Sequence, residues 1–431
     1  MRYPVYSEYE ESGVAWIGER PKHWLVMKLH HMVRMKSGSA ITTVEMDDED
    51  EYPVFGGNGM RGRFSEYNHE GAYVLIGRQG AECGNINYAS GKFWASEHAV
   101  VATLDRELEY RWLGETLRAM DLNQYSQAAA QPGLSVEVIG RLKLPFPPLS
   151  EQQQIAAFLD WKTGQIDALI ARKKELLEKL KEKRLAVITQ AVTKGLNLTV
   201  PMRDSGISWL GEVPEHWEVK RLKFYSERVY TGSTPPSSEP QYFEDPSLDW
   251  FTPGDFNEVG GTLSDARRKI SPSAVEDGVV NYFAKPCVLL IGIGATLGRV
   301  GLAESPFACN QQINVVIPTS EVETKFLFYS LSVKQQTMRV ISNASTLGIM
   351  NQETTRQIEI PAPEQREQKL IVEFLDGATV KTDILSAKVE SVISRLTEYR
   401  TALITAATTG KIDVSKVKIP AAKPPSAKGR K

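Results

Sequence analysis

The sequence predicts an α+β protein in which two mixed, strand-rich domains and two long helices are related by pseudo-twofold symmetry. Two internal repeats predict this fold class. Residues 144–196 return without a gap as residues 360–412, 216 positions later, and a box at residues 12–29 returns as residues 205–222, 193 positions later. A chain of 431 residues is too long for one hydrophobic core. Because two repeats are too few for a solenoid, a tandem duplication is the simplest interpretation.

The repeats divide the chain into consecutive parts. These are a repeat box (residues 1–29), a variable segment (30–143), a long helix (144–196), a second box (197–222), a second variable segment (223–359), a second long helix (360–412) and a basic flexible tail (413–431). The second variable segment is longer by 23 residues, which is the difference between the two offsets. Each box carries a His-Trp pair, His23-Trp24 and His216-Trp217. We expect the boxes to dock the chain against the long helices rather than to carry out chemistry.

Both variable segments are predicted to be strand-rich. Short apolar, β-branched runs predict strands at residues 72–76, 99–104, 288–293 and 313–317. Glycine-rich stretches at residues 56–59 and 292–294 favour hairpins. Apolar residues at helical spacing predict helices at residues 110–123 and 325–340.

Each long helix follows prolines that prevent an earlier helix from continuing into it, and each has apolar residues at three- and four-residue steps. In the second copy these steps alternate as in a heptad repeat. The predicted seam consists of Leu385, Val389, Val392, Leu396 and Leu403, with Leu169, Leu176, Leu180 and Val187 in the first copy. A single stripe of this kind also suits packing on a globular core. Two matched stripes in one chain favour pairing of the helices with each other.

Composition excludes several classes of protein. Hydrophobic residues make up 42% of the chain and charged residues 24%, and no apolar run reaches the length of a membrane span. The amino terminus lacks signal-peptide character, so we expect a cytoplasmic protein. The three cysteines, Cys83, Cys287 and Cys309, are widely spaced and argue against a disulfide framework or a zinc site.

The sequence also lacks the motifs of an enzyme. Residues 57–62 match GxGxxG, but no helical pattern follows them, which argues against a dinucleotide site. No Walker A pattern, no Asn-Pro-Pro-aromatic stretch of an amino-methyltransferase and no Pro-Asp nuclease dipeptide is present. The six histidines lack metal-ligand spacing. We therefore expect a chain without its own active site, metal or cofactor.

Polar residues in glycine-rich turns offer a recognition surface instead. Arginine with guanine, and asparagine or glutamine with adenine, are the pairings that geometry favours in the major groove. Each single residue also suits a solvated or turn-capping role, whereas the clusters favour DNA contact. The candidates are Asn58, Arg61, Arg63, Arg78, Gln79, Asn85, Asn87 and Lys92 in the first segment, and Thr231, Ser233, Thr234, Arg267, Arg268, Lys269, Arg299, Asn310, Gln311 and Gln312 in the second.

From about residue 12 to residue 412 the chain resembles the specificity subunit of a type I restriction-modification system. The resemblance rests on SGVAWIGERPKHWLVMKL and SGISWLGEVPEHWEVKRL, on LPFPPLSEQQQIAAFLD and IPAPEQREQKLIVEFLD, and on YPVFGGNGMRG, VLIGRQGAECGN, FWASEHAVV, VYTGSTPP and FACNQQINVVIP. It implies two target-recognition domains, each reading one half of an asymmetric, bipartite double-stranded DNA site. It also implies that the helices form an antiparallel coiled-coil spacer.

The same resemblance implies partners and cofactors outside this chain. Two methyltransferase (M) subunits would carry S-adenosylmethionine, and restriction (R) motor-nuclease subunits would use ATP and Mg. The chain itself would be non-catalytic.

Three alternatives remain open at the level of sequence. A stand-alone DNA-binding regulator would bind tightly without a methyltransferase, whereas a specificity subunit would need one. A methyltransferase fused to a recognition domain would transfer methyl groups by itself. A scaffold that never touches DNA would tolerate Arg78→Ala and Arg268→Ala.

Overall fold

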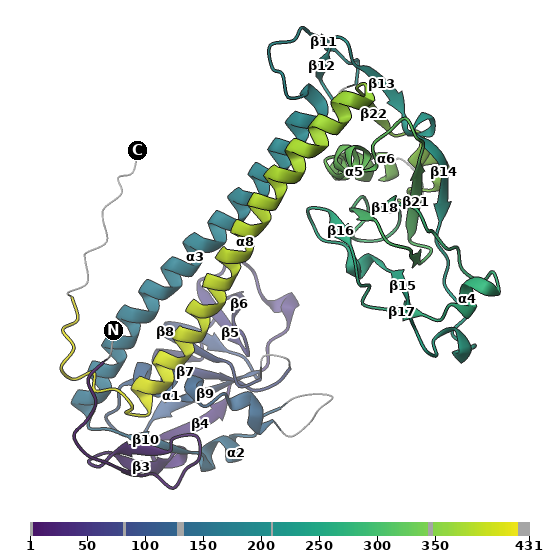
Figure 1. Ribbon diagram of the computed structural model, residues 1–431. Coiled ribbons are helices and arrows are strands. Elements are labelled where there is room, and N and C mark those ends of the chain that lie inside the picture. Colours follow the sequence, from purple (N-terminus) through teal and green to yellow (C-terminus); the bar gives the residue numbers. More distant parts are fainter. Residues whose placement is uncertain (1–2, 81–82, 127–132, 208–209, 344–347, 421–431) are drawn as a thin grey trace. The chain divides into compact units, whose positions relative to one another are not determined.

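The computed structural model describes residues 3–80, 83–126, 133–207, 210–343 and 348–420. The chain forms two compact units, unit 1 with Met1–Lys174 and Ser391–Lys431, and unit 2 with Glu175–Glu390. The two long helices, α3 (Leu149–Lys194) and α8 (Gln365–Thr408), each contribute one half to unit 1 and the other half to unit 2 (Figure 1). Among the described helices, none has the length and apolar character needed to cross a membrane.

Unit 1 contains a six-stranded sheet with the order β4-β9-β7-β8-β5-β6 (Figure 1). The strands are β4 (Val33–Ser37), β5 (Tyr52–Gly56), β6 (Gly59–Phe64), β7 (His69–Gly77), β8 (Ile86–Ala95) and β9 (Ala99–Leu104). Neighbouring strands are antiparallel except β5 and β8, which are parallel. Helix α1 (Tyr110–Ala119) packs on β7 and β8, and α2 (Val136–Arg141) packs beside β4.

Unit 2 repeats the first four strands of that order in its own five-stranded sheet, β14-β21-β18-β19-β16. These strands are β14 (Ser226–Thr231), β16 (Gly261–Leu263), β18 (Cys287–Ile291), β19 (Val300–Ala303) and β21 (Ile313–Pro318). A separate three-stranded sheet consists of β15 (Leu248–Phe251), β17 (Lys269–Ile270) and β20 (Ala308–Cys309). Unit 2 also contains the shorter α-helices α4 (Ser273–Glu276), α5 (Thr324–Ser332), α6 (Gln335–Asn343) and α7 (Gln352–Arg356).

The predicted strands lie in β7, β9, β18 and β21, and the glycine-rich turns close the hairpins β5-β6 and β18-β19, as expected. Two predicted helices need correction. The helix expected at residues 110–123 ends at Ala119, because Asp121 adopts a left-handed backbone conformation with φ of 49°. The helix expected at residues 325–340 is two helices, since the chain breaks at Lys334 to bury that side chain, whose Nζ donates to the Glu359 carbonyl.

The long helices start later than the repeats that encode them. Residues 144 and 360 lie in strands, β10 (Lys143–Phe146) and β22 (Glu359–Ala362), which pair with β3 (Leu25–Lys28) and β13 (Glu218–Arg221). The prolines keep both stretches extended before the helix begins. Each box also forms a second small pair, β1 (Tyr9–Glu11) with β2 (Glu19–Pro21), and β11 (Met202–Asp204) with β12 (Glu212–Pro214).

Within each unit the two long helices lie antiparallel. In unit 1, Arg400 Nε lies 2.8 Å from the Asp167 carboxylate, and in unit 2, Arg184 Nε lies 3.3 Å from the Asp383 carboxylate. The two ion pairs are each other's copies, because both Asp residues and both Arg residues are related by the 216-residue offset. The predicted antiparallel pairing of the helices is confirmed.

The buried stripe of these helices agrees only in part with the predicted seam, in which Leu180 is buried and Leu176, Val187 and Leu396 are half-buried. Val389 and Leu403 are also buried. In contrast, Leu385 is 44% exposed, Val392 39% and Leu169 41%. Half-buried Ser386 and Ile393 take the interior positions instead. Residues 385 and 386 lie four and three positions before Val389, so either one fits a heptad step. The two side chains nevertheless point in directions about 100° apart around the helix. The sequence pattern favoured the more apolar choice at residue 385, whereas the helix places a small serine inside.

The boxes dock onto the starts of the long helices, as predicted. Glu151 in the first turn of α3 accepts hydrogen bonds from Trp24 Nε1 at 3.0 Å and Tyr6 OH at 2.8 Å, and it lies 2.7 Å from His23 Nε2. Its copy Glu367, in the first turn of α8, accepts from Trp217 Nε1 at 2.9 Å and lies 3.1 Å from His216 Nε2. The helix dipole also stabilises a carboxylate in the first helical turn. The boxes therefore fix where each helix begins.

Candidate nucleic-acid interface

In unit 1 the candidate residues gather where the β5-β6 turn meets the β7-β8 loop. Asn85 Nδ2 donates to Asn58 Oδ1 at 2.7 Å, and Asn87 Nδ2 donates to the Gly57 carbonyl at 3.4 Å. Gly59 has a φ of 96° and faces the Asn87 amide, so the turn uses a conformation that glycine favours. Gln79 adds an isolated bridge to residue 133 beside the same turn.

Two arginines extend this cluster. Arg78 donates from Nη1 to Ser37 Oγ at 3.2 Å, while its backbone N–H donates to the His98 carbonyl at 2.9 Å. The side chain of Arg61 occupies the space next to Gly56, where a Cβ would lie 3.0 Å from Arg61 Cδ. Amide and guanidinium groups, the donors that read adenine and guanine, thus share one end of the sheet.

The structure does not bring Arg63 and Lys92 to this cluster. Arg63 donates from Nε and Nη2 to the carbonyls of Asp50 and Glu51, which holds the acidic loop. Lys92 pairs across the sheet with Glu70, at the opposite end of the β7-β8 hairpin, and its Nζ lies 4.6 Å from the centre of the Tyr67 ring.

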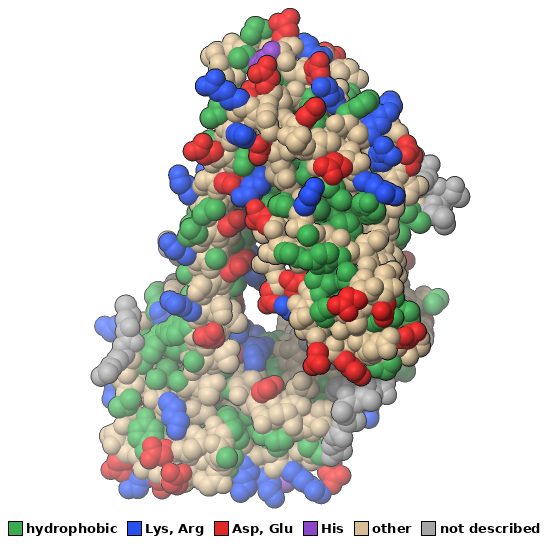
Figure 2. Space-filling model, turned by 45° about the vertical axis from the view of Figure 1, so that its right-hand side comes forward, with side chains coloured by type: hydrophobic (Ala, Val, Ile, Leu, Met, Phe, Trp, Pro, Cys, Tyr) green, Lys and Arg blue, Asp and Glu red, His purple; other side chains and the backbone are tan. Residues whose placement is uncertain are grey.

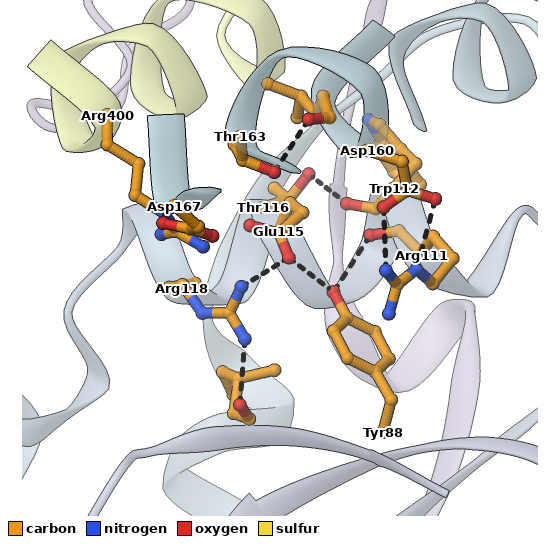
Figure 3. Close-up of polar contacts among 12 residues, drawn as sticks. Tyr88, Arg111, Trp112, Glu115, Thr116, Arg118, Asp160, Thr163, Asp167 and Arg400 are labelled. Carbon is orange, nitrogen blue, oxygen red and sulfur yellow. Dashed lines mark hydrogen bonds and ion pairs between the residues drawn. The ribbon is translucent and has the colours of Figure 1, made fainter. Parts of the chain in front are cut away.

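A polar network under the sheet fixes the strand that carries Asn87 (Figure 3). Tyr88 OH donates to Glu115 Oε1 of α1 at 2.8 Å, and Arg118 pairs with the same carboxylate. Arg111 then joins α1 to Asp160 of α3 at 2.7 Å. The turn that carries Asn85 and Asn87 is therefore held to the unit 1 part of α3 through β8 and α1.

In unit 2 the candidate residues at and after the end of β14 meet the start of β21 and the residues that precede it. Thr231 Oγ1 donates to Asn314 Oδ1 at 3.0 Å, and the Thr234 hydroxyl donates to Gln311 Oε1. Asn310 Nδ2 donates to Gln312 Oε1 at 3.1 Å. Ser233 and residues 310–312 thus form a second cluster of hydroxyl and amide groups.

The basic candidates of unit 2 divide between this cluster and other places. The Arg268 guanidinium lies 5.1 Å from the Trp250 ring centre, and Trp250 Nε1 donates to the Ser233 carbonyl at 3.1 Å, which places Arg268 beside the cluster. Arg267 lies by the Thr252–Asp255 turn, where its N–H donates to Asp255. The two candidates engaged elsewhere are Lys269, which pairs with Asp249 and Asp265, and Arg299, which donates to the Phe256 carbonyl.

Sequence reasoning missed three polar residues of this cluster. Asn281 donates from its N–H to Ser233 Oγ at 3.1 Å, and the Gln352 amide contacts the Thr231 hydroxyl at 3.1 Å. Asn314 is 3% exposed and donates to the Met350 carbonyl at 2.6 Å. An asparagine inside the apolar run of β21 is a signal that could have identified it, since buried amides need partners.

Basic and acidic side chains alternate over the face drawn in Figure 2 rather than gathering in one basic patch. No group of three or more His, Cys, Asp or Glu side chains in the described ranges could hold a metal ion.

Comparison with known proteins identifies relatives with this organisation. A model of the family described as Type I restriction modification DNA specificity domain matches residues 21–182 and 214–394. The EcoprrI specificity subunit of Escherichia coli is 45% identical over 136 residues, 31% of this chain and 34% of that protein. The MjaIX specificity subunit of Methanocaldococcus jannaschii is 31% identical over 169 residues, 38% of each chain. The chain thus spans little more than a third of the length of these two relatives.

Longer matches exist at lower identity. A putative type I restriction enzyme specificity subunit of Haemophilus influenzae is 25% identical over 353 residues, which cover 78% of this chain and 82% of that protein. A solved chain from work on complex assembly and conformational transition of the type I R-M system has a TM-score of 0.61 at 17% identity, and covers 90% of this chain and 98% of that chain. The structural likeness shows a shared fold.

Proposed function

The chain belongs to the type I restriction modification DNA specificity family, and on this premise we propose that it is the subunit that chooses the DNA sequence for a type I restriction-modification system. Residues 30–143 and 223–359 act as target-recognition domains, each reading one half of an asymmetric, bipartite site in double-stranded DNA. The long helices set the unread gap between the halves. The protein acts in the cytoplasm, where its DNA lies.

The observation that carries this proposal is the duplication of one strand order with unlike polar turns. Both units contain the order that begins β4-β9-β7-β8 in unit 1 and β14-β21-β18-β19 in unit 2. The candidate polar residues lie at different places on this frame, Arg78 and Asn85 in the β7-β8 loop of unit 1, and Thr231 at the end of β14 with Asn310 and Gln312 before β21 in unit 2. Two copies of one frame with different donors and acceptors would read two different short sequences.

The catalytic steps belong to partners in this proposal. Two methyltransferase (M) subunits, holding S-adenosylmethionine, bind the chain and methylate an adenine in each half-site. Restriction (R) motor-nuclease subunits, using ATP and Mg, join for cleavage. A near-neutral chain suits this division of labour, because partner subunits can supply phosphate contacts while this chain supplies base contacts. Methylation in a duplex also requires base flipping, which an enzyme partner would perform.

Methylome sequencing of host cells with and without the gene tests the proposal. We expect one bipartite, asymmetric motif to lose adenine methylation when the gene is deleted. Exchanging residues 30–143 for the equivalent segment of a relative should change one half of the motif and leave the other half intact. An unchanged methylome after deletion would contradict the proposal.

A gel-shift experiment separates this role from that of a stand-alone regulator. We expect selective binding to the motif only when the methyltransferase subunit is added. Tight, selective binding by the purified chain alone would favour the regulator instead.

A further inference from the structure

One turn is built twice from the same backbone contacts, at residues 96–98 in unit 1 and at residues 310–312 in unit 2. We name these the first and second reading turns. Three backbone hydrogen bonds fix the first: Gly38 N to Ala99 O at 3.0 Å, Ser39 N to Ala95 O at 3.0 Å, and Ser96 N to Phe55 O at 2.9 Å. The second has the same three: Gly232 N to Ile313 O at 3.0 Å, Ser233 N to Cys309 O at 2.9 Å, and Asn310 N to Phe251 O at 3.0 Å.

The supports under the two turns also match. In unit 1, the rings of Phe55 and Phe93 lie 5.6 Å apart, and β5 runs parallel to the end of β8. In unit 2, the rings of Phe251 and Phe307 lie 5.7 Å apart, and β15 runs parallel to β20. Each turn therefore rests on an aromatic pair and a parallel strand pair.

A glycine is required next to each turn. A Cβ on Gly38 would lie 2.0 Å from the Ala95 carbonyl oxygen, and a Cβ on Gly232 would lie 2.3 Å from the Asn310 carbonyl oxygen. Non-bonded heavy atoms do not approach this closely, so only glycine fits at either position. Both turns depend on the same close approach of two backbones. The frame is common to the two domains, and any difference in what it reads must come from the side chains that it carries.

Those side chains differ in chemistry. The first reading turn carries Glu97 and His98, whose side chains are 37% and 42% exposed and lie 3.3 Å apart. Glu97 Oε2 is shielded from solvent and has no hydrogen-bond partner among the described residues. The second carries Gln311 and Gln312 at the equivalent positions, so a carboxylate in one domain corresponds to an amide in the other.

We propose that the reading turns determine which base each domain selects at one position of its half-site, Glu97 selecting cytosine in the first half and Gln311 with Gln312 selecting adenine in the second. This inference rests on the proposed function. A carboxylate accepts a hydrogen bond from the N4 amino group of cytosine, whereas a glutamine amide both accepts from N6 and donates to N7 of adenine. The Glu97 side chain is 37% exposed, so its carboxylate can supply the acceptor for that contact.

The test uses the full chain expressed with its methyltransferase subunit and reads the motif by methylome sequencing. Glu97→Gln with His98→Gln places the second turn's side chains on the first frame. We expect one cytosine of the first half-site to be replaced by adenine or to become degenerate, while the second half stays unchanged. Gln311→Glu should alter the second half only. Glu66→Gln, an exposed change of the same chemistry elsewhere in unit 1, is the matched control and should leave the motif intact.

Binding of the purified complex to duplexes that differ at single positions gives the size of the effect. We expect the preference for the selected base to fall by about 5- to 150-fold in each variant. A variant that methylates the unaltered motif, or that ranks the duplexes as the wild type does, overturns the inference. A wild-type complex that yields no bipartite motif would instead refute the proposed function, so the two failures are distinguishable.

Discussion

Replacing Glu151 by alanine should cost unit 1 about twice the free energy of unfolding that Glu367→Ala costs unit 2. The carboxylate of Glu151 accepts from Trp24, which is buried, and from Tyr6, which is half-buried. Within the described residues, buried Trp217 is the one such donor to the carboxylate of Glu367. The two partner histidines are about half exposed and contribute little to either site.

The magnitude follows from the number of shielded donors. A hydrogen bond to a charged group contributes about 1.5–3 kcal/mol, and a buried donor left without an acceptor incurs a cost of that order. Two donors give a loss of about 3–6 kcal/mol for Glu151→Ala, against about 1.5–3 kcal/mol for Glu367→Ala. Both carboxylates occupy the first turn of a long helix, so the helix-dipole contribution is similar in the two and does not affect the ratio.

Hydrogen–deuterium exchange is the suitable measurement, because it reports the opening free energy of each unit separately. Tyr6→Phe completes a double-mutant cycle with Glu151→Ala and should be costly in the wild type but nearly neutral after Glu151 is removed. Equal losses in the two units, or a larger loss for Glu367→Ala, would refute the reasoning from shielded donors.

Three other changes have expected outcomes. Gly38→Ala should cost about 1–3 kcal/mol or more in thermal unfolding, because its Cβ would overlap the Ala95 carbonyl, whereas Gly164→Ala, in an open part of α3, should stabilise by about 0.5–1 kcal/mol; equal effects would contradict this. Burial raises the pKa of Tyr329 to about 12. The neutral phenol therefore stabilises the folded state fully below pH about 10, and this stabilisation is lost as the pH rises from about 10 to about 12. Tyr329→Phe should flatten the alkaline decline of stability measured by denaturant titration, and an unchanged decline would argue against it. Burial also raises the pKa of the Cys287 thiol to about 12, so a thiol reagent at neutral pH should label it only as unit 2 unfolds; rapid labelling of the folded chain would contradict this.

The repeats predicted the fold well because both the long helices and the boxes that dock onto them are duplicated in the sequence. The long helices were identified from a 216-residue offset and the boxes from a 193-residue offset, and the structure joins them through Glu151 and Glu367. The exact seam could not be predicted in the same way. Leu385 and Ser386 both fit the heptad steps, and only the packed pair of helices decides between them.

Candidate side chains were harder to predict than elements. Glycine-rich turns indicate where loops lie, but whether a basic residue points to a partner or to its own chain depends on tertiary neighbours. Arg63 holds carbonyls of the acidic loop and Lys269 pairs with two aspartates, which neither composition nor spacing reveals. The first reading turn was overlooked although FWASEHAVV aligns with FACNQQINV, since a Ser-Glu-His sequence lacks the amides that indicated the second.

Unit 1 is built from both ends of the chain, and this has a consequence for its synthesis. Its core combines Trp24 and Ile155 with Leu403 and Val414, and the N–H of residue 413 donates to the Pro4 carbonyl at 2.8 Å. Unit 2 is continuous in sequence and can close while the chain is still on the ribosome. The amino-terminal part of unit 1 must therefore wait for residues 391–420 to be translated. Until then the apolar side of α3 in unit 1 lacks its partner and stays exposed to non-native contacts.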